Sequence, residues 1–118
     1  MNDVISILSV VGDSDWIATE DGLPVYNRIK QLLNDGQEAY VSFAGYTSAY
    51  TPFLNAAIGQ AYRDFPVEFV DSHLHLLDLD EYLRLKMPIV KTASVQYYNA
   101  RKEMQAKSEA ELNKEFAS

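Results

Sequence analysis

Three short stretches of the chain either alternate apolar and polar residues or are rich in β-branched residues, and both patterns predict strands. The middle stretch is the most regular, because Ala39, Val41 and Phe43 alternate with polar or amphipathic neighbours. That pattern is typical of a central strand buried in a sheet. The main strands are therefore predicted at residues 4–11, 38–44 and 73–77, with a short additional strand at residues 16–18.

Between these strands, apolar residues recur every three or four positions, which is the spacing of one face of a helix. Gly36 supplies the left-handed conformation that ends the first helix. In the second helix, Thr51 is predicted to be a hydroxyl N-cap and Pro52 the first helical residue. Pro88 is predicted to break or kink the last helical stretch. The helices are predicted at residues 21–35, 51–65, 81–86 and 89–107.

The predicted elements alternate between strand and helix, and this order favours a sheet of parallel strands with right-handed crossovers. The predicted fold class is therefore α/β, a small βαβαβα sheet with helices packed on it. With 118 residues the chain fits one domain spanning residues 1–118, whose charged, alanine-rich end at 108–118 is expected to fray. Where the second helix crosses the central strand, we expect a buried core of Phe43, Leu54 and Ile58.

Charge and composition narrow the functional classes. The net charge is −7, which disfavours binding to nucleic acid or to anionic membranes. No apolar run approaches the ~18–20 residues that span a bilayer, and the acidic start is unlike a signal peptide. Since the chain also lacks cysteine, we expect a cytoplasmic protein. The acidic surface is explained by solubility, or by a face that docks on a basic partner or mimics nucleic acid.

Five short motifs follow one another in a characteristic order. The most specific is FLNAAIG at residues 53–59, directly after a hydroxyl-rich loop. Through these motifs, residues 18–98 resemble the STAS-like domains of a family of unknown function, DUF4325. The other motifs are GLPVY at 22–26, LLNDG at 32–36, VSFAG at 41–45 and LHLLDL at 74–79.

The resemblance implies a small sheet domain related to anti-sigma-factor antagonists. Those relatives bind kinase-like ATPases and are switched by phosphorylation at the start of the helix after the central strand. The matching position here is Thr51, with Ser48 as a second candidate for phosphorylation. The family's central strand usually carries an acidic residue where this chain has Ser42, so the charge in this region is expected to be lower.

The same loop offers candidate binding residues. Tyrosine combines a large contact area with a polar tip and is enriched at interfaces, although peripheral core packing explains many tyrosines equally well. For Thr51 the alternative role is helix capping, which we favour because Pro52 lacks the N–H group that an anion site needs. The candidate binding residues are Tyr46, Ser48, Tyr50, Thr51 and Asn55.

Residues 71–75 (DSHLH) imitate the start of a metal-dependent hydrolase motif. On a strand, His73 and His75 would face the same side and could share a metal ion. However, those hydrolases are barrels of ~250 residues, so we favour two half-exposed histidines without a metal. Phosphate-binding loops, Ser/His/Asp arrangements and Cys/His clusters are missing from the sequence. We therefore expect a protein that is not an enzyme and that uses no cofactor.

The sequence thus predicts a non-catalytic regulatory module that binds another protein through residues 46–55. The resemblance makes a kinase-like ATPase the candidate partner. An acidic inhibitor or nucleic-acid mimic that blocks a basic surface is the alternative, and a metal-dependent enzyme centred on His73 and His75 is a third. The sequence leaves the oligomeric state open.

Overall fold

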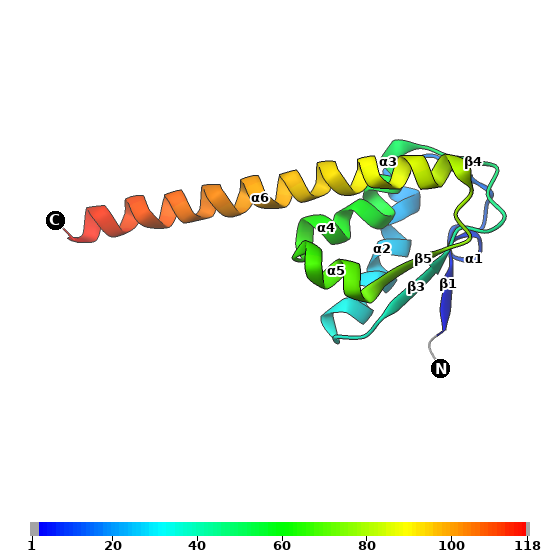
Figure 1. Cartoon of the computed structure of the whole chain (residues 1–118), viewed down its shortest axis with the longest axis horizontal. Coiled ribbons are helices and arrows are strands. Elements are labelled where there is room, and N and C mark those ends of the chain that lie inside the picture. The colour runs from blue at the N-terminus through cyan, green and yellow to red at the C-terminus, as the bar shows by residue number, and fades with distance from the viewer. Residues whose placement is uncertain (1–2, 118) are drawn as a thin grey trace.

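The structure is a computed structural model that describes residues 3–117, with side chains described as far as Glu111. Short strands and helices alternate along the chain before one long final helix (Figure 1). The elements are β1 (Val4–Ser6), α1 (Ile7–Val11), β2 (Asp15–Trp16), α2 (Thr19–Asn34), β3 (Ala39–Ser42), β4 (Ser48–Ala49), α3 (Thr51–Leu54), the π-helical turn η1 (Asn55–Gly59), α4 (Gln60–Asp64), α5 (Val67–His73), β5 (Leu74–Leu77) and α6 (Glu81–Ala117).

The main sheet is parallel and has the strand order β1-β3-β5. In its register, Val41 of the central strand lies beside Ile5 on one side and Leu76 on the other. Strands β2 and β4 form a second parallel sheet, in which each strand is two residues long. The predicted α/β class and the parallel pairing of the strands are therefore confirmed.

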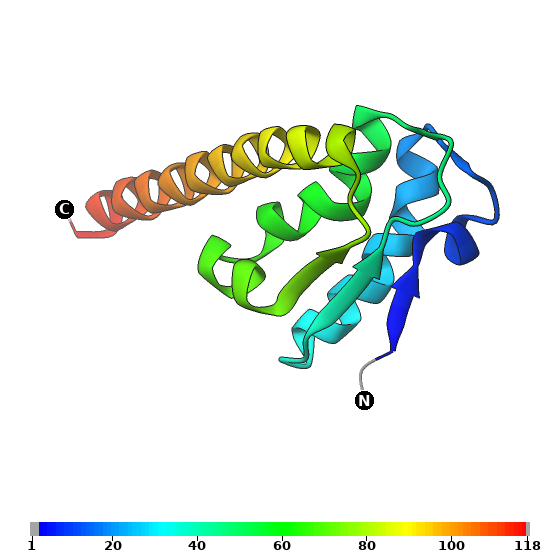
Figure 2. The same cartoon turned by 45° about the vertical axis from the view of Figure 1, so that its right-hand side comes forward.

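The helices that follow the strands cover one side of the main sheet, and its other side faces the viewer in Figure 2. Burial alternates accordingly along β3, where Ala39 and Val41 are fully buried while Tyr40 and Ser42 are half-buried. At the edge of the sheet, Val4 is 52% exposed. Within residues 3–117 the domain thus has two layers, helices on one side and a sheet with an open face on the other.

The core lies where the helical segment from α3 to α4 crosses the central strand. Phe43 and Leu54 are fully buried and Ile58 is almost so, which confirms the predicted centre of the core. Trp16 is also fully buried, and its ring lies 5.4 Å from that of Phe53. Side chains of this size dominate the hydrophobic stabilisation of a small domain.

Helix α2 approaches the segment α3–η1 at very short range, and Gly22 makes this approach possible. A β-carbon at Gly22 would lie 2.8 Å from the carbonyl oxygen of Phe53 and 2.9 Å from the amide nitrogen of Ala57. Because both atoms belong to the backbone, no side-chain rotation would remove these contacts. The motifs GLPVY and FLNAAIG, far apart in the sequence, therefore pack directly on one another.

The first predicted strand is shorter than expected. The chain extends only to Ser6, and residues Ile7–Val11 form helix α1 instead of continuing the strand. The Ser6 hydroxyl accepts a hydrogen bond from the Ser9 amide, and Gly12 ends the helix with φ 80°. These two caps outweigh the β propensity of the intervening valines and isoleucine.

Helix α6 runs through Pro88 without a break, so the prediction of two helices was wrong. Its first half is held against the body by buried Leu83, Met87 and Val90, which lie on both sides of the proline. Their packing offsets the ~3 kcal/mol that a proline costs inside a helix. The tail beyond residue 107 continues the helix through Ala117, and its fraying stays a prediction.

Candidate functional site

The loop between β3 and α3 is held by backbone hydrogen bonds. The sequence predicted a loop without regular structure here, but Ser48 and Ala49 form strand β4, which pairs with β2. The prediction was therefore wrong for these two residues. The Thr47 amide donates to the Ser14 carbonyl at 2.7 Å, and the Tyr50 amide donates to the Trp16 carbonyl at 2.9 Å. The two-residue sheet thus fixes the path of the chain up to the start of α3.

Tyr46 joins this loop to the start of α6. Its ring packs on Trp16 with 5.3 Å between centroids, and its hydroxyl donates a hydrogen bond to the carboxylate of Asp80. Burial, together with this bond to a carboxylate, raises the pKa of Tyr46 to about 12. The same hydrogen bond lowers the pKa of Asp80. Tyr46 is therefore half-buried and structural, with only part of its ring available for binding.

A shallow hollow of about 280 Å³ opens beside this loop. Tyr50 stands at its edge with 52% of its surface exposed, and Ser48 is half-buried in the hollow. The hydroxyl of Tyr82 donates to the Ala49 carbonyl at 3.1 Å, which brings the first turn of α6 into the same site. Three tyrosine rings from two distant segments therefore surround the hollow, which is lined by Tyr46, Thr47, Ser48, Ala49, Tyr50 and Tyr82.

Thr51 is not the N-cap that the sequence predicted. The N-cap is Tyr50, without a side-chain capping bond, and Thr51 is the first residue of α3. Pro52 accordingly lies one position further into the helix, where its missing N–H group still costs no helical hydrogen bond. The Thr51 side chain is exposed, and no hydrogen bond of its hydroxyl occurs among the described residues. Its predicted capping role was therefore wrong.

Asn55, the fifth predicted binding residue, lies in a different depression. It begins the π-helical turn η1 and lines a groove of about 350 Å³ between the start of α2 and the segment α3–α4. Single π-helical turns occur frequently at functional sites. The groove is lined by Thr19, Leu23, Pro52, Asn55, Ala56, Gln60 and Arg63. The structure thus places Tyr46, Ser48 and Tyr50 in one hollow and Asn55 in another, with Thr51 and Pro52 between them in the sequence.

A carboxylate lies beside Ser42 after all. The Ser42 hydroxyl donates to Asp78 at 2.6 Å, and Asp78 follows the neighbouring strand β5. Asp78 has φ 61°, a left-handed conformation that aspartate tolerates better than most residues. Asp78 therefore supplies a carboxylate where the central strand ends, and the lower charge expected from Ser42 relative to the family stays a prediction.

The two histidines do not form a joint site. His73 is the last residue of α5 rather than part of the strand, and its ring stacks on Phe69 at 4.1 Å. His75 lies on β5, where its ring stacks on Tyr40 and its Nε2 lies 3.0 Å from the Glu38 carboxylate. The prediction that both histidines share one strand face was wrong. Within the described residues, no group of three or more side chains could hold a metal ion.

Sequence reasoning missed Trp16, Asp80 and Tyr82 as parts of this site. Asp80 caps the start of α6, where its carboxylate accepts a hydrogen bond from the Leu83 amide at 2.9 Å. Its bond to Tyr46 joins residues 34 positions apart, and no local pattern shows such a contact. Tyr82 could have been found by the feature that it shares with other tyrosines of this chain, an aromatic residue near the end of a helix.

The fold and the site together define a small parallel α/β domain with an aromatic, hydroxyl-bearing surface where the central strand leads into the next helix. Residues 21–84 match the model of the STAS-like domain of unknown function (DUF4325), which is more than half of the chain. The chain belongs to this family. No curated protein and no solved structure matches it. None of the helices within residues 3–117 is long and apolar enough to cross a membrane.

Proposed function

We propose that this protein is a non-catalytic regulatory module of the cytoplasm that binds another protein through the docking surface formed by residues 46–55. The observation that carries the proposal is the exposed pair of Tyr50 and Thr51 beside the tyrosine-lined hollow. An aromatic ring that is half exposed and held by a fixed backbone contributes contact area with little loss of conformational entropy.

The partner class follows from the family. Relatives of STAS-like domains bind kinase-like ATPases at the helix that follows the central strand, and here that helix begins at Thr51. The exposed Thr51 hydroxyl is accessible to a kinase, with the half-buried Ser48 as the second candidate. A phosphate on Thr51 would lie at the start of a helical segment that runs to Asp64, where the helix dipole favours negative charge.

The distribution of carboxylates favours this reading over an acidic mimic. A mimic of nucleic acid needs its carboxylates on one face. In this structure, Asp78 and Asp80 lie where β5 leads into α6, whereas Asp3 and Glu38 directly precede the starts of β1 and β3 at the opposite end of the sheet. Acidic side chains thus occur at both ends of the sheet, as expected for a surface that keeps the protein in solution.

The experiment uses Thr51→Asp and Tyr50→Ala, with Asn27→Asp on the exposed face of α2 as the matched control for charge. Wild-type protein is immobilised, and the protein it retains from native lysate is purified and titrated by calorimetry. Thr51→Asp should leave the melting temperature unchanged, because aspartate suits the first turn of a helix. It should weaken binding at least tenfold, which is about 1.4 kcal/mol.

Two results would contradict the proposal. Binding of Thr51→Asp and Tyr50→Ala with wild-type affinity would remove residues 46–55 from the interface. Equal weakening by Asn27→Asp would instead show a general effect of negative charge, which the acidic-surface alternative predicts.

A further inference from the structure

Helix α6 carries an exposed apolar stripe on the side that faces away from the body. Leu85 and Met104 are each 69% exposed and Ile89 is 63% exposed, while the alanines of the stripe are exposed as well. The six residues of the stripe are spaced 4, 4, 3, 4 and 4 positions apart along the helix, which is close to the 3.6 residues of one helical turn. This seam, as we call it, consists of Leu85, Ile89, Ala93, Gln96, Ala100 and Met104.

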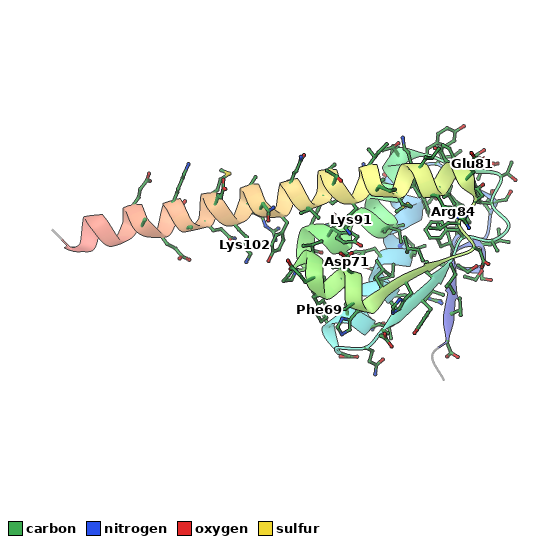
Figure 3. All side chains as sticks on the ribbon, in the orientation of Figure 1. Phe69, Asp71, Glu81, Arg84, Lys91 and Lys102 are labelled. Carbon is green, nitrogen blue, oxygen red and sulfur yellow. The ribbon has the colours of Figure 1, made fainter. Side chains whose placement is uncertain are left out.

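The opposite side of α6 is already occupied. Leu83, Met87 and Val90 are buried against the body, and the Lys91 ammonium lies 2.9 Å from the Asp71 carboxylate of α5 (Figure 3). Beyond this region, the helix projects away from the domain (Figure 1), and every side chain from residue 99 to residue 111 is exposed. A helical segment of this length without tertiary packing is marginal in water, since most helical stability comes from packing.

We propose that the seam pairs with the seam of a second copy of this chain, with the two α6 helices antiparallel. The intervals of 4, 4, 3, 4 and 4 read the same from either end, and an isologous two-fold contact requires this self-complementarity. In the matching register Leu85 faces Met104, Ile89 faces Ala100, and Ala93 faces Gln96. Two large side chains then meet at each end of the seam, and each alanine lies opposite a larger side chain, which lets the two helices approach each other closely.

Charge favours the antiparallel direction. Residues 1–80 contain twelve acidic and three basic residues, whereas residues 84–107 contain six basic residues and one acidic residue. Parallel pairing would bring two acidic bodies together, and antiparallel pairing keeps them at opposite ends. It also places three basic residues of one α6, Arg101, Lys102 (Figure 3) and Lys107, along the start of the partner's α6. In this register Lys107 lies opposite Tyr82, next to Asp80 and Glu81.

The size of the seam sets the expected strength. From Leu85 to Met104 the helix rises about 28 Å, and a helix about 10 Å wide gives a contact of about 280 Å² per chain. Apolar patches of this size also occur on monomeric proteins, and standard stable interfaces bury about 800 Å² per partner. We therefore expect a weak, reversible dimer that forms only as the concentration rises.

The test is sedimentation equilibrium on the full chain across the micromolar range. Wild-type protein should approach twice its mass of 13.3 kDa as the concentration rises. Ile89→Glu should raise the dimer dissociation constant at least tenfold, because the glutamate would be buried without a partner. The control Gln105→Glu adds the same charge at an exposed position outside the seam and should dimerise like wild type. Circular dichroism at a concentration where wild type is monomeric should show equal helix content in all three.

Cysteine cross-linking fixes the direction independently, because the natural chain has no cysteine. A mixture of Leu85→Cys and Met104→Cys chains should form a disulfide between the two variants under mild oxidation, while neither variant cross-links efficiently with itself. Self-cross-linking of Met104→Cys would show parallel pairing and overturn the register. A wild-type monomer at every concentration, or an Ile89→Glu dimer as strong as wild type, would overturn the proposal. This inference stands without the proposed function.

Discussion

Replacing Gly22 by alanine tests the closest helix contact in the structure. In most helices this substitution stabilises by about 1 kcal/mol, because alanine has the higher helix propensity. Here the new β-carbon would lie 2.8–3.0 Å from three atoms of the segment α3–η1, two of them in the backbone. Overpacking of this kind costs about 1–3 kcal/mol, and the upper end applies because backbone atoms cannot rotate away. We expect a net loss of about 2 kcal/mol.

Urea unfolding followed by circular dichroism would measure this loss, and thermal unfolding should show a decrease of about 8 °C or more. Gly59→Ala is the matched control. Its β-carbon would meet the Ser94 hydroxyl at 2.8 Å and a methyl group of Val90 at 3.1 Å. Both obstacles are side chains, so partial relaxation should make the loss smaller than at Gly22. Unchanged or increased stability of Gly22→Ala would refute the rigid contact between α2 and η1.

Three further predictions concern the core, the tyrosine hydroxyl and the histidines. Ile58→Ala should cost about 2–5 kcal/mol in urea unfolding, and near-wild-type stability would contradict the helix-on-sheet core. Because folding raises the pKa of Tyr46 from 10 to about 12, its contribution is complete below pH 10 and is lost as the pH rises through 12. The difference in melting temperature between wild type and Tyr46→Phe should therefore shrink over that interval. Zinc at modest excess should leave the melting temperature unchanged, and a rise that His73→Ala abolishes would contradict this.

Elements with a clear apolar period could be predicted from the sequence. The alternation around Val41 and the three-to-four spacing after Pro52 depend only on which side of each element is buried. These patterns gave the correct α/β class, the parallel strands and the buried centre at Phe43, Leu54 and Ile58. The order of the family motifs added the correct family for residues 21–84.

Element ends were predicted less well, because tertiary contacts decide them. Pro88 is a strong local signal for a helix break, but residues on both sides of it are buried against the body. Residues Ile7–Val11 have the composition of a strand, but caps at Ser6 and Gly12 make them a helix. The same shift occurs at His73, which the sequence placed on a strand and the structure places at the end of α5.

At the candidate site, the sequence could not predict which tyrosines are buried by tertiary contacts. The sequence singled out the tyrosines of the loop, but it could not show that Tyr46 is held by Trp16 and Asp80 while Tyr50 is 52% exposed. That distinction depends on contacts between residues 30 and 34 positions apart. It also changes which residue best tests binding, because replacing Tyr46 removes its packing on Trp16 and its bond to Asp80, whereas about half of Tyr50 is exposed.

The pair of Ser42 and Asp78 shows how the sheet brings together residues that are far apart in the sequence. Ser42 is the last residue of the central strand, and the carboxylate beside it comes from the end of the neighbouring strand. Parallel strands end at the same edge of a sheet, so a side chain just beyond β5 occupies nearly the same place as one at the end of β3. The hydrogen bond between them offsets the cost of the left-handed conformation of Asp78. The negative charge at this edge therefore depends on the arrangement of the strands rather than on the residue at position 42.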